Sequence, residues 1–302
     1  MNMYLELKSR LAEQIAGNEN YLHHLCVLFD LYVKNLDSLA RGTMAEERPR
    51  LNLFVTGPTG TGKTESIKIA AQIMGLYLHR IDCTTLSAEG WNGTNLSDHL
   101  RNFMRDSAQD GKHFNGVGVI LLDEFDKLCS KTCTAGGGRP TEDTQHNMLD
   151  LLDGFTCPDA LVIAAGSFQS LRLADSKASH IGFHKRGANT KQIDWVKRMV
   201  DEGIIPELAN RFTDWAETEK LSKKEIKSVI LAKKNSAFKK YQEILQGFDL
   251  KHYEIDHLVD AVHASDQGLR ILNMEIYRLI NRHYHRMFCE PIEKAKKERS
   301  NF

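Results

Sequence analysis

The sequence predicts an α/β fold, in which a parallel sheet carries helices on both faces and a smaller, mostly helical domain follows it. Three observations support this prediction. The apolar run 51–56 leads into a glycine-rich loop at 57–64, and a helical pattern comes after the loop. A second apolar run, 117–122, ends in two acidic residues. From about residue 218 onward the alternation of strand and helix patterns gives way to helices.

The first elements can be placed by the spacing of their apolar residues. Helical spacing predicts helices over 4–15 and 19–39, before the strand 51–56. Beyond the loop we expect a helix over 65–74, a short strand over 77–81, a helix over 95–107 capped by Thr94, the strand 117–122, a helix over 144–152 and a strand over 161–165. Strands that alternate with helices in this way form a parallel sheet.

The second domain is expected to be helical. Ser222-Lys223-Lys224-Glu225 has the pattern of a capping box that opens a helix. Further helices are predicted over 255–263 and 269–288. We therefore expect a large domain over residues 1–217 and a small helical domain over 218–302.

The loop after the first strand has the G-x4-G-K-[ST] spacing of a phosphate-binding loop. Its residues are Gly57, Pro58, Thr59, Gly60, Thr61, Gly62, Lys63 and Thr64. A turn between a buried strand and a helix presents backbone N–H groups to an anion, and glycines let the backbone wrap a triphosphate closely. Lys63 can reach the β and γ phosphates, and the Thr64 hydroxyl can bind Mg²⁺.

The second apolar run supplies the other half of the predicted nucleotide site. Asp123 follows it directly and is placed to hold Mg²⁺, either itself or through water. Glu124 is the candidate for polarising the attacking water. Two acids at a strand end also occur in solvated turns, but the phosphate-binding loop earlier in the chain favours nucleotide hydrolysis.

Composition limits the remaining classes of function. The 40 Lys and Arg balance the 40 Asp and Glu, so no net field indicates nucleic acid or a membrane. No apolar run has transmembrane length, and the N-terminus lacks a secretory signal pattern. Six scattered cysteines, 26, 83, 129, 133, 157 and 289, favour free thiols in a reducing cytoplasm over a zinc site.

Six segments, in this order, resemble the AAA+ ATPase superfamily and, within it, the ClpX-type (Clp/HslU) unfoldases. They are 15–18 near the adenine, 82–86 with 89–93 leading into the first pore loop, 123–128 at Walker B, 144–149 with 152–154 after the second pore loop, 203–212 with the arginine finger, and 268–270 at sensor 2. The resemblance covers nearly the whole chain. It implies that the nucleotide is ATP with Mg²⁺, and that a homo-oligomeric ring, a hexamer, threads a protein substrate through its pore.

The resemblance also assigns roles to single residues. Arg211 takes the place of the arginine finger, whose guanidinium reaches a phosphate held by a neighbouring subunit. Arg270 takes the sensor-2 place and Ser167 the sensor-1 place, while Ile15 falls near the adenine. Each has a structural alternative: Arg211 as an ordinary surface arginine, Arg270 paired with Asp266, and Ser167 as the cap of a turn.

Trp91 is the candidate for gripping the substrate. It lies between Gly90 and Asn92-Gly93, outside any periodic apolar run. The family uses an aromatic residue on such a glycine-flanked loop to hold an extended polypeptide in the pore. Here Trp stands where the family usually has Tyr, and Asn92 replaces an aliphatic residue. A tryptophan folded back onto its own domain is the alternative.

A possible docking tripeptide follows the sensor-1 strand. Ile181, Gly182 and Phe183 match the Ile-Gly-Phe sequence with which ClpX-type proteins dock into clefts of the ClpP peptidase. The apolar pair could instead pin its loop to its own domain. A third option is that His180, His184, Lys185 and Arg186 form a basic contact for an acidic partner.

The sequence departs from the family in two places. Only residues 1–56 precede the phosphate-binding loop, so we expect the family's N-terminal zinc-binding domain to be missing. The loop 129–141 differs from the family's second pore loop, although Arg139 could still face the pore.

The whole pattern predicts an ATP-driven, ring-forming protein unfoldase or remodeller. A nucleic-acid remodeller or loader is one alternative, against which the neutral charge and the aromatic character of 90–93 argue. A regulatory ATP switch is the other, and the presence of both Glu124 and Arg211 argues against it.

Overall fold

A computed structural model describes the chain at residues 2–86, 94–108, 116–129, 140–168, 195–233, 236–245 and 249–289. The chain divides into two compact units. The larger consists of Met1–Leu11, Glu19–Pro58 and Lys63–Glu219, and the smaller of Ala12–Asn18, Thr59–Gly62 and Lys220–Phe302. Trp91, Arg139 and the tripeptide 181–183 lie outside the described residues.

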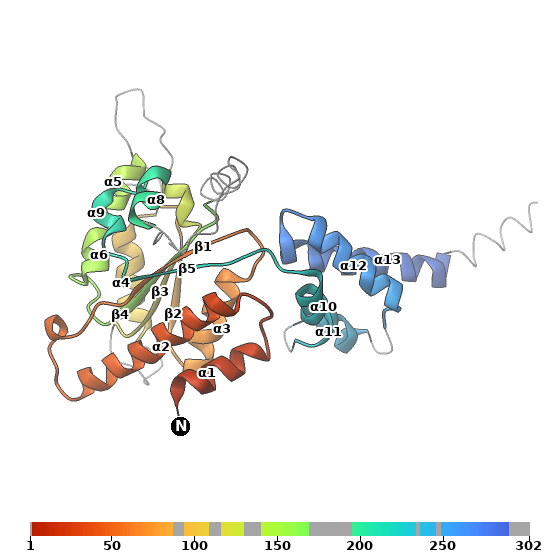
Figure 1. The fold of residues 1–302 in the computed structure, drawn as a ribbon, viewed down its shortest axis with the longest axis horizontal. Helices are drawn as coiled ribbons and strands as arrows, with labels where there is room; N and C mark the ends of the chain where they lie inside the picture. Colours follow the sequence, from red (N-terminus) through yellow and green to blue (C-terminus); the bar gives the residue numbers. More distant parts are fainter. Residues whose placement is uncertain are drawn as a thin grey trace, which may run out of the picture. The chain divides into compact units, whose positions relative to one another are not determined.

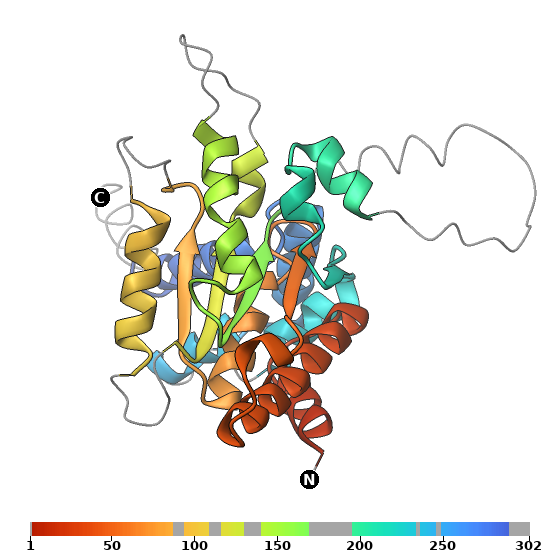
Figure 2. The same ribbon diagram turned by 90° about the vertical axis from the view of Figure 1, so that its left-hand side faces the viewer.

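A five-stranded parallel sheet forms the centre of the larger unit (Figures 1 and 2). Its strands are β1 (Asn52–Thr56), β2 (Leu78–Asp82), β3 (Gly118–Asp123), β4 (Ala160–Ala165) and β5 (Asp214–Glu217), in the spatial order β2-β3-β4-β1-β5. Every residue of β1 and β3 is buried, as the two continuous apolar runs predict.

Helices cover both faces of this sheet (Figure 1). One face carries α1 (Met3–Ala12), α2 (Glu19–Ala40) and α3 (Lys63–Met74). The other carries α4 (Leu96–Asp106), α5 (Pro140–Asn147), α6 (Leu149–Asp153), α8 (Trp195–Glu202) and α9 (Pro206–Ala209). Short 3₁₀ segments, η1 (Ala45–Glu47) and η2 (Phe125–Cys129), complete the unit. The predicted α/β architecture is therefore confirmed.

Aromatic side chains fill the core between the sheet and the second helical layer. Phe54 of β1 lies at its centre, with ring centroids 5.0 Å from Phe168, 5.2 Å from Phe212 and 6.1 Å from both Phe125 and Trp215. All of these rings except that of Trp215 belong to buried residues. This core holds the ends of β1, β3 and β4 rigidly, and the candidate site is built on those ends.

Some predicted elements need correction. The helix expected over 144–152 is two helices, because the chain turns at Met148 between α5 and α6. Thr94 does not cap α4: Asn95 is the N-cap residue, and the Thr94 hydroxyl instead donates to the Thr85 carbonyl at 3.1 Å. Strand β5 and helix α8 were not expected from the sequence.

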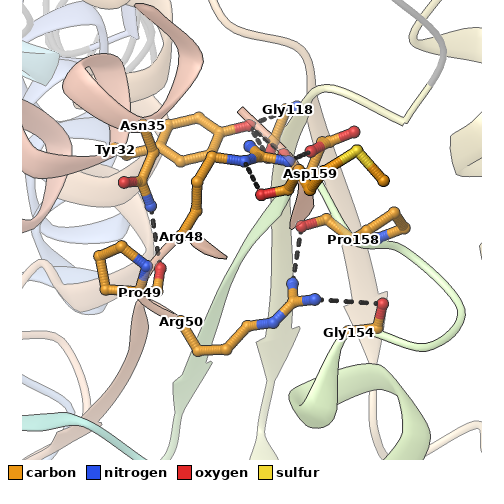
Figure 3. A network of polar contacts seen from close by, with 10 residues as sticks. Tyr32, Asn35, Arg48, Pro49, Arg50, Gly118, Gly154, Pro158 and Asp159 are labelled. Carbon is orange, nitrogen blue, oxygen red and sulfur yellow. Dashed lines mark hydrogen bonds and ion pairs between the residues drawn. The ribbon is translucent and has the colours of Figure 1, made fainter. Parts of the chain in front are cut away.

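A polar network fastens the N-terminal region to the sheet (Figure 3). The Tyr32 hydroxyl accepts the Gly118 N–H at 2.9 Å and lies 2.6 Å from the Asp159 carbonyl oxygen. Arg48 pairs with the Asp159 carboxylate, and Arg50 donates to the Pro158 carbonyl at 2.6 Å and to the Gly154 carbonyl at 3.3 Å. The turn between α6 and β4 is thereby held at both of its ends.

The smaller unit is helical, as predicted. Its helices are α10 (Lys223–Leu231), α11 (Ala237–Ile244), α12 (His252–Ala264) and α13 (Leu272–Tyr284), with a 3₁₀ turn η3 (Gly268–Ile271) and a π-helical end η4 (His285–Cys289). The predicted capping box is present: the Ser222 side chain accepts from the Glu225 N–H, and Glu225 accepts from the Ser222 N–H at 2.7 Å. Ile230, Leu258 and Ile276 are fully buried in its core.

Candidate nucleotide site

The start of the phosphate-binding loop requires glycine. Gly57 follows the buried strand β1 with φ of +134°, and a Cβ atom there would lie 2.2 Å from the Thr218 carbonyl oxygen. Any other residue would force β1 and the end of β5 apart. Lys63, the first residue of α3, folds over the loop and donates from Nζ to the Gly57 carbonyl at 2.6 Å and the Pro58 carbonyl at 2.8 Å. The structure thus holds the lysine charge against the loop's own backbone.

The middle of the loop belongs to the smaller unit. The Leu269 N–H donates to the Gly60 carbonyl at 3.0 Å, and a Cβ on Gly60 would lie 1.9 Å from the Gln267 carbonyl oxygen. Residues 59–62 therefore pack against the segment that immediately precedes Arg270. Arg270 itself lies on the 3₁₀ turn η3 rather than on a regular α-helix.

The carboxylate of Asp123 is the centre of the site in the larger unit. Both of its oxygens lie 3.2 Å from Thr64 Oγ1, and one of them accepts the Glu124 N–H at 3.0 Å. A threonine hydroxyl beside a carboxylate is the hard oxygen donor set that Mg²⁺ prefers, so these residues fit the ion. Lys63, Thr64, Asp123 and Glu124 are thus brought to one edge of the sheet.

Arg80 is a residue of this site that the sequence did not reveal. Arg80 lies on the neighbouring strand β2, two residues before Asp82, which pairs with Asp123 in the sheet. Its Nε donates to Asp123 Oδ2 at 2.7 Å. The Arg80 side chain is 52% exposed, whereas that of Asp123 is 9% exposed. The signal available in the sequence was a charged residue within the predicted strand 77–81, which pairs with the strand that ends in Asp123.

Glu124 has an unusual backbone conformation. Its φ of +54° lies in the left-handed region, which costs a residue with a Cβ about 1–2 kcal/mol. Such strain persists where the surroundings determine the conformation, and it concentrates at functional sites. The turn follows directly on β3, so the Glu124 side chain leaves the sheet beside Asp123.

Ser167 is hydrogen-bonded to the segment that follows Glu124. Its N–H donates to Asp126 Oδ1 at 3.0 Å, and its hydroxyl donates to Oδ2 at 2.8 Å. Burial acts to raise the pKa of Asp126, but the bonds from Lys127 and Ser167 together lower that pKa below its ordinary value. The sensor-1 position and the Walker-type segment are thereby joined, and a role for Ser167 in orienting water stays a prediction.

Arg211 lies beyond α9 with its guanidinium bound on two sides. Nε donates to Asp153 Oδ1 at 2.7 Å, and Nη1 donates to the Glu207 carbonyl at 2.6 Å. The structure therefore places it against α6 and α9, and its action on a neighbouring subunit stays a prediction. Ile15 is partly buried in the smaller unit, in the segment where a Cβ atom on Gly17 would lie 2.5 Å from the Glu225 carboxylate.

Within the part of the chain that the structure describes, no helix is long and apolar enough to cross a membrane.

Comparison with known proteins agrees with this geometry. The family model described as "ATPase family associated with various cellular activities (AAA)" matches residues 53–178. The ATP-dependent Clp protease ATP-binding subunit ClpX of Treponema denticola is 27% identical, with 97% of this chain and 78% of the relative covered. ClpX of Borrelia duttonii is 25% identical, with 89% and 69% covered, and ClpX of Azotobacter vinelandii is 26% identical, with 82% and 65% covered. The phosphate-binding loop follows β1 and the acidic pair follows β3, the two strands that flank β4 in the sheet, and these features together with the matches support a ClpX-like AAA+ ATPase.

Proposed function

We propose that the chain is an ATP-driven protein unfoldase that works as a hexameric ring and threads polypeptide through an axial pore. The observation that carries this proposal is the placement of Thr64, Asp123 and Glu124 beside the phosphate-binding loop, in a chain whose relatives are ClpX proteins along most of their length. We take residues 1–217 as the large ATPase domain and 218–302 as the small domain. The change of compact unit between Glu219 and Lys220 supports this boundary, whereas Ala12–Asn18 and Thr59–Gly62 group with the smaller unit.

The residues of the large domain divide the chemistry of hydrolysis among themselves. The loop 57–64 binds the phosphates through its backbone, and the Lys63 ammonium exchanges its two carbonyl partners for the β and γ oxygens. Thr64 and Asp123 would hold Mg²⁺, which supplies charge neutralisation on the phosphates when bound. Glu124 orients the attacking water and polarises it.

Two arginines complete the proposed cycle. Arg211 stabilises the charge that develops on a phosphate in the neighbouring subunit, an effect worth about 10³–10⁵ in rate for arginine fingers. Arg270, in the sensor-2 position, responds to loss of the terminal phosphate and turns it into domain rotation. Ile15 contributes to the adenine pocket.

Substrate contact is assigned to Trp91, between β2 and α4. The ends of its segment are joined by a bridge between Leu86 and Thr94, and the Thr94 N–H donates to the Thr85 carbonyl at 3.3 Å. Leu100 and Phe103 bury α4 in the core. Force on the segment is therefore resisted by a rigid base, which supports a role in pulling.

A ClpP-like peptidase is the proposed partner, docked through Ile181, Gly182 and Phe183. The support is that the relatives are named as ATP-binding subunits of an ATP-dependent Clp protease. The cytoplasmic location expected from the sequence stays a prediction. The comparisons give no support to a nucleic-acid remodeller or to a regulatory switch.

The decisive experiment measures ATP hydrolysis together with unfolding of a tagged, stably folded reporter. Lys63→Ala should lose ATP binding, Glu124→Gln should bind ATP without turnover, and Lys68→Ala on the exposed face of α3 should behave like the parent. Trp91→Ala should hydrolyse ATP without unfolding the reporter, whereas Trp91→Tyr should retain both activities. An ATPase that moves no protein substrate in any of these assays would contradict the proposal.

Peptidase docking is tested separately, by sedimentation of the parent and Phe183→Ala with the peptidase of the source organism. We expect an ATP-dependent complex with the parent and a weaker one with the variant. Absence of a complex with the parent would remove the peptidase from the proposal and leave the unfoldase in place.

A further inference from the structure

The guanidinium of Arg211 is held in a frame made by its own subunit. Asp153, the last residue of α6, accepts from Nε at 2.7 Å, and the Glu207 carbonyl accepts from Nη1 at 2.6 Å. Both side chains of the ion pair are 30% exposed, so the pair lies at the surface of the large unit and can be approached from outside.

The frame itself is rigid, because a buried side chain fixes the backbone of both partners. Asn52, which is 3% exposed, donates from Nδ2 to the Leu152 carbonyl at 3.0 Å and to the Arg211 carbonyl at 3.1 Å. Helix α6 ends at Asp153 and is followed by Gly154, which has a φ of +76°. The Gly154 carbonyl accepts a hydrogen bond from the Arg50 guanidinium, which holds the turn (Figure 3). The Asp153 carboxylate thus cannot follow Arg211 if the arginine swings away.

The bonds leave the outer edge of the guanidinium available. Arginine has five N–H donors, of which one on Nε and one on Nη1 are used within the described part of the chain. The remaining three lie on Nη1 and Nη2, the pair of nitrogens that can bind phosphate in a bidentate manner.

We propose that Asp153 is a positioning residue for the arginine finger: it fixes the Nε edge of Arg211 so that the Nη edge is presented to the nucleotide of the neighbouring subunit. This inference rests on the proposed action of Arg211 across the subunit interface. A surface ion pair contributes little to the stability of the fold, so the pair's effect is expected in turnover.

The test compares Asp153→Ala, Asp153→Asn and Arg211→Ala, with Asp150→Ala on the exposed side of the same helix as control. Asp153→Ala should lower kcat by about 10–100-fold, as a misplaced catalytic group does, with KM for ATP and Tm unchanged. Asp153→Asn keeps an oxygen that accepts from Nε, so it should recover most of the lost turnover. Asp150→Ala should match the parent.

Mixed rings separate positioning from a general structural defect. Subunits with Asp153→Ala keep an intact site of their own, so mixing them with Glu124→Gln subunits should restore turnover, as for Arg211→Ala. Mixing Asp153→Ala with Arg211→Ala should restore none. This pattern cannot arise from a subunit that is simply damaged.

The outcomes that overturn the inference are distinct from those that overturn the proposed function. Parent-level turnover in Arg211→Ala would show that the finger assignment is wrong, and the role of Asp153 would fall with it. If Arg211→Ala loses turnover while Asp153→Ala matches or exceeds the parent, only the positioning role is wrong. Equal losses in Asp153→Asn and Asp153→Ala with a lowered Tm would show a structural role instead.

Discussion

Gln145 of α5 joins three segments of the large unit through one buried side chain. It is 2% exposed, and its Nε2 donates to the Leu128 carbonyl at 2.9 Å and the Gly203 carbonyl at 3.1 Å. Its Oε1 accepts the Ile205 N–H at 2.8 Å. The side chain thus connects the end of η2 with the segment that leads into α9 and Arg211.

Replacing Gln145 by Leu keeps the volume and removes all three bonds. Two carbonyl groups and one N–H group would then be buried without partners, and each such group costs about 1–3 kcal/mol. Because part of this cost is recovered by relaxation and by the added apolar surface, we expect a loss of about 3–5 kcal/mol. This is a large share of the stability of a typical domain, about 5–15 kcal/mol.

Urea unfolding, followed by tryptophan fluorescence, measures this loss of unfolding free energy in the larger unit of the chain. All three tryptophans belong to the larger unit, and the rings of Trp195 and Trp215 lie 5.2 Å apart, so their emission reports its unfolding. Gln72→Leu makes the same change on the exposed face of α3 and should stay within about 0.5 kcal/mol of the parent. A Gln145→Leu variant that unfolds within about 1 kcal/mol of the parent, with an unchanged m-value, would refute the reasoning.

Two further predictions concern the charged groups around the site. Arg80→Met should lower, by about fivefold, the Mg²⁺ concentration needed for binding of a fluorescent ATP analogue. The reason is that the half-exposed Arg80 cation at Asp123 opposes binding of the ion by about 1 kcal/mol. An unchanged or raised Mg²⁺ requirement would show that Arg80 does not compete with the ion. The lowered pKa of Asp126 means that its contribution to stability is fully present above its ordinary value of 3.8 and is lost as the pH falls through the lower folded-state pKa. Asp126→Asn should therefore be less stable than the parent at neutral pH, and the difference should shrink in urea titrations below pH 3.8; a difference independent of pH would contradict this.

Four of the five strands were predicted from their own residues. β1, β3 and β4 are continuous apolar runs because both of their faces are buried, and the shorter β2 was expected over 77–81 and lies at Leu78–Asp82. β5 (Asp214–Glu217) has no such run: it is four residues long, lies at the edge, and is a strand because Leu53 to Thr56 pair with it. The break at Met148 was missed for a related reason, since no Gly or Pro marks it.

The same distinction separates the parts of the site. The phosphate-binding loop and the acidic pair Asp123-Glu124 are local sequence features, so their spacing was sufficient to find them. Arg80 and Asp123 are 43 residues apart, and Asp153 and Arg211 are 58 apart. Such contacts depend on the order of strands in the sheet, which the sequence pattern does not specify.

Two buried polar side chains give the segment 203–212, which carries the proposed arginine finger Arg211, two fixed attachments. Asn52 ties the Arg211 backbone to β1, the strand that leads into the phosphate-binding loop, and Gln145 ties residues 203–205 to α5, which begins at Pro140 after the second pore-loop segment. Neither attachment can lengthen without leaving a buried polar group unpaired. A displacement of α5 must therefore either carry the 203–212 segment with it or break hydrogen bonds at a cost comparable to that of Gln145→Leu. This cost gives a physical reason why a displacement of α5 and the placement of Arg211 would be coupled within one subunit.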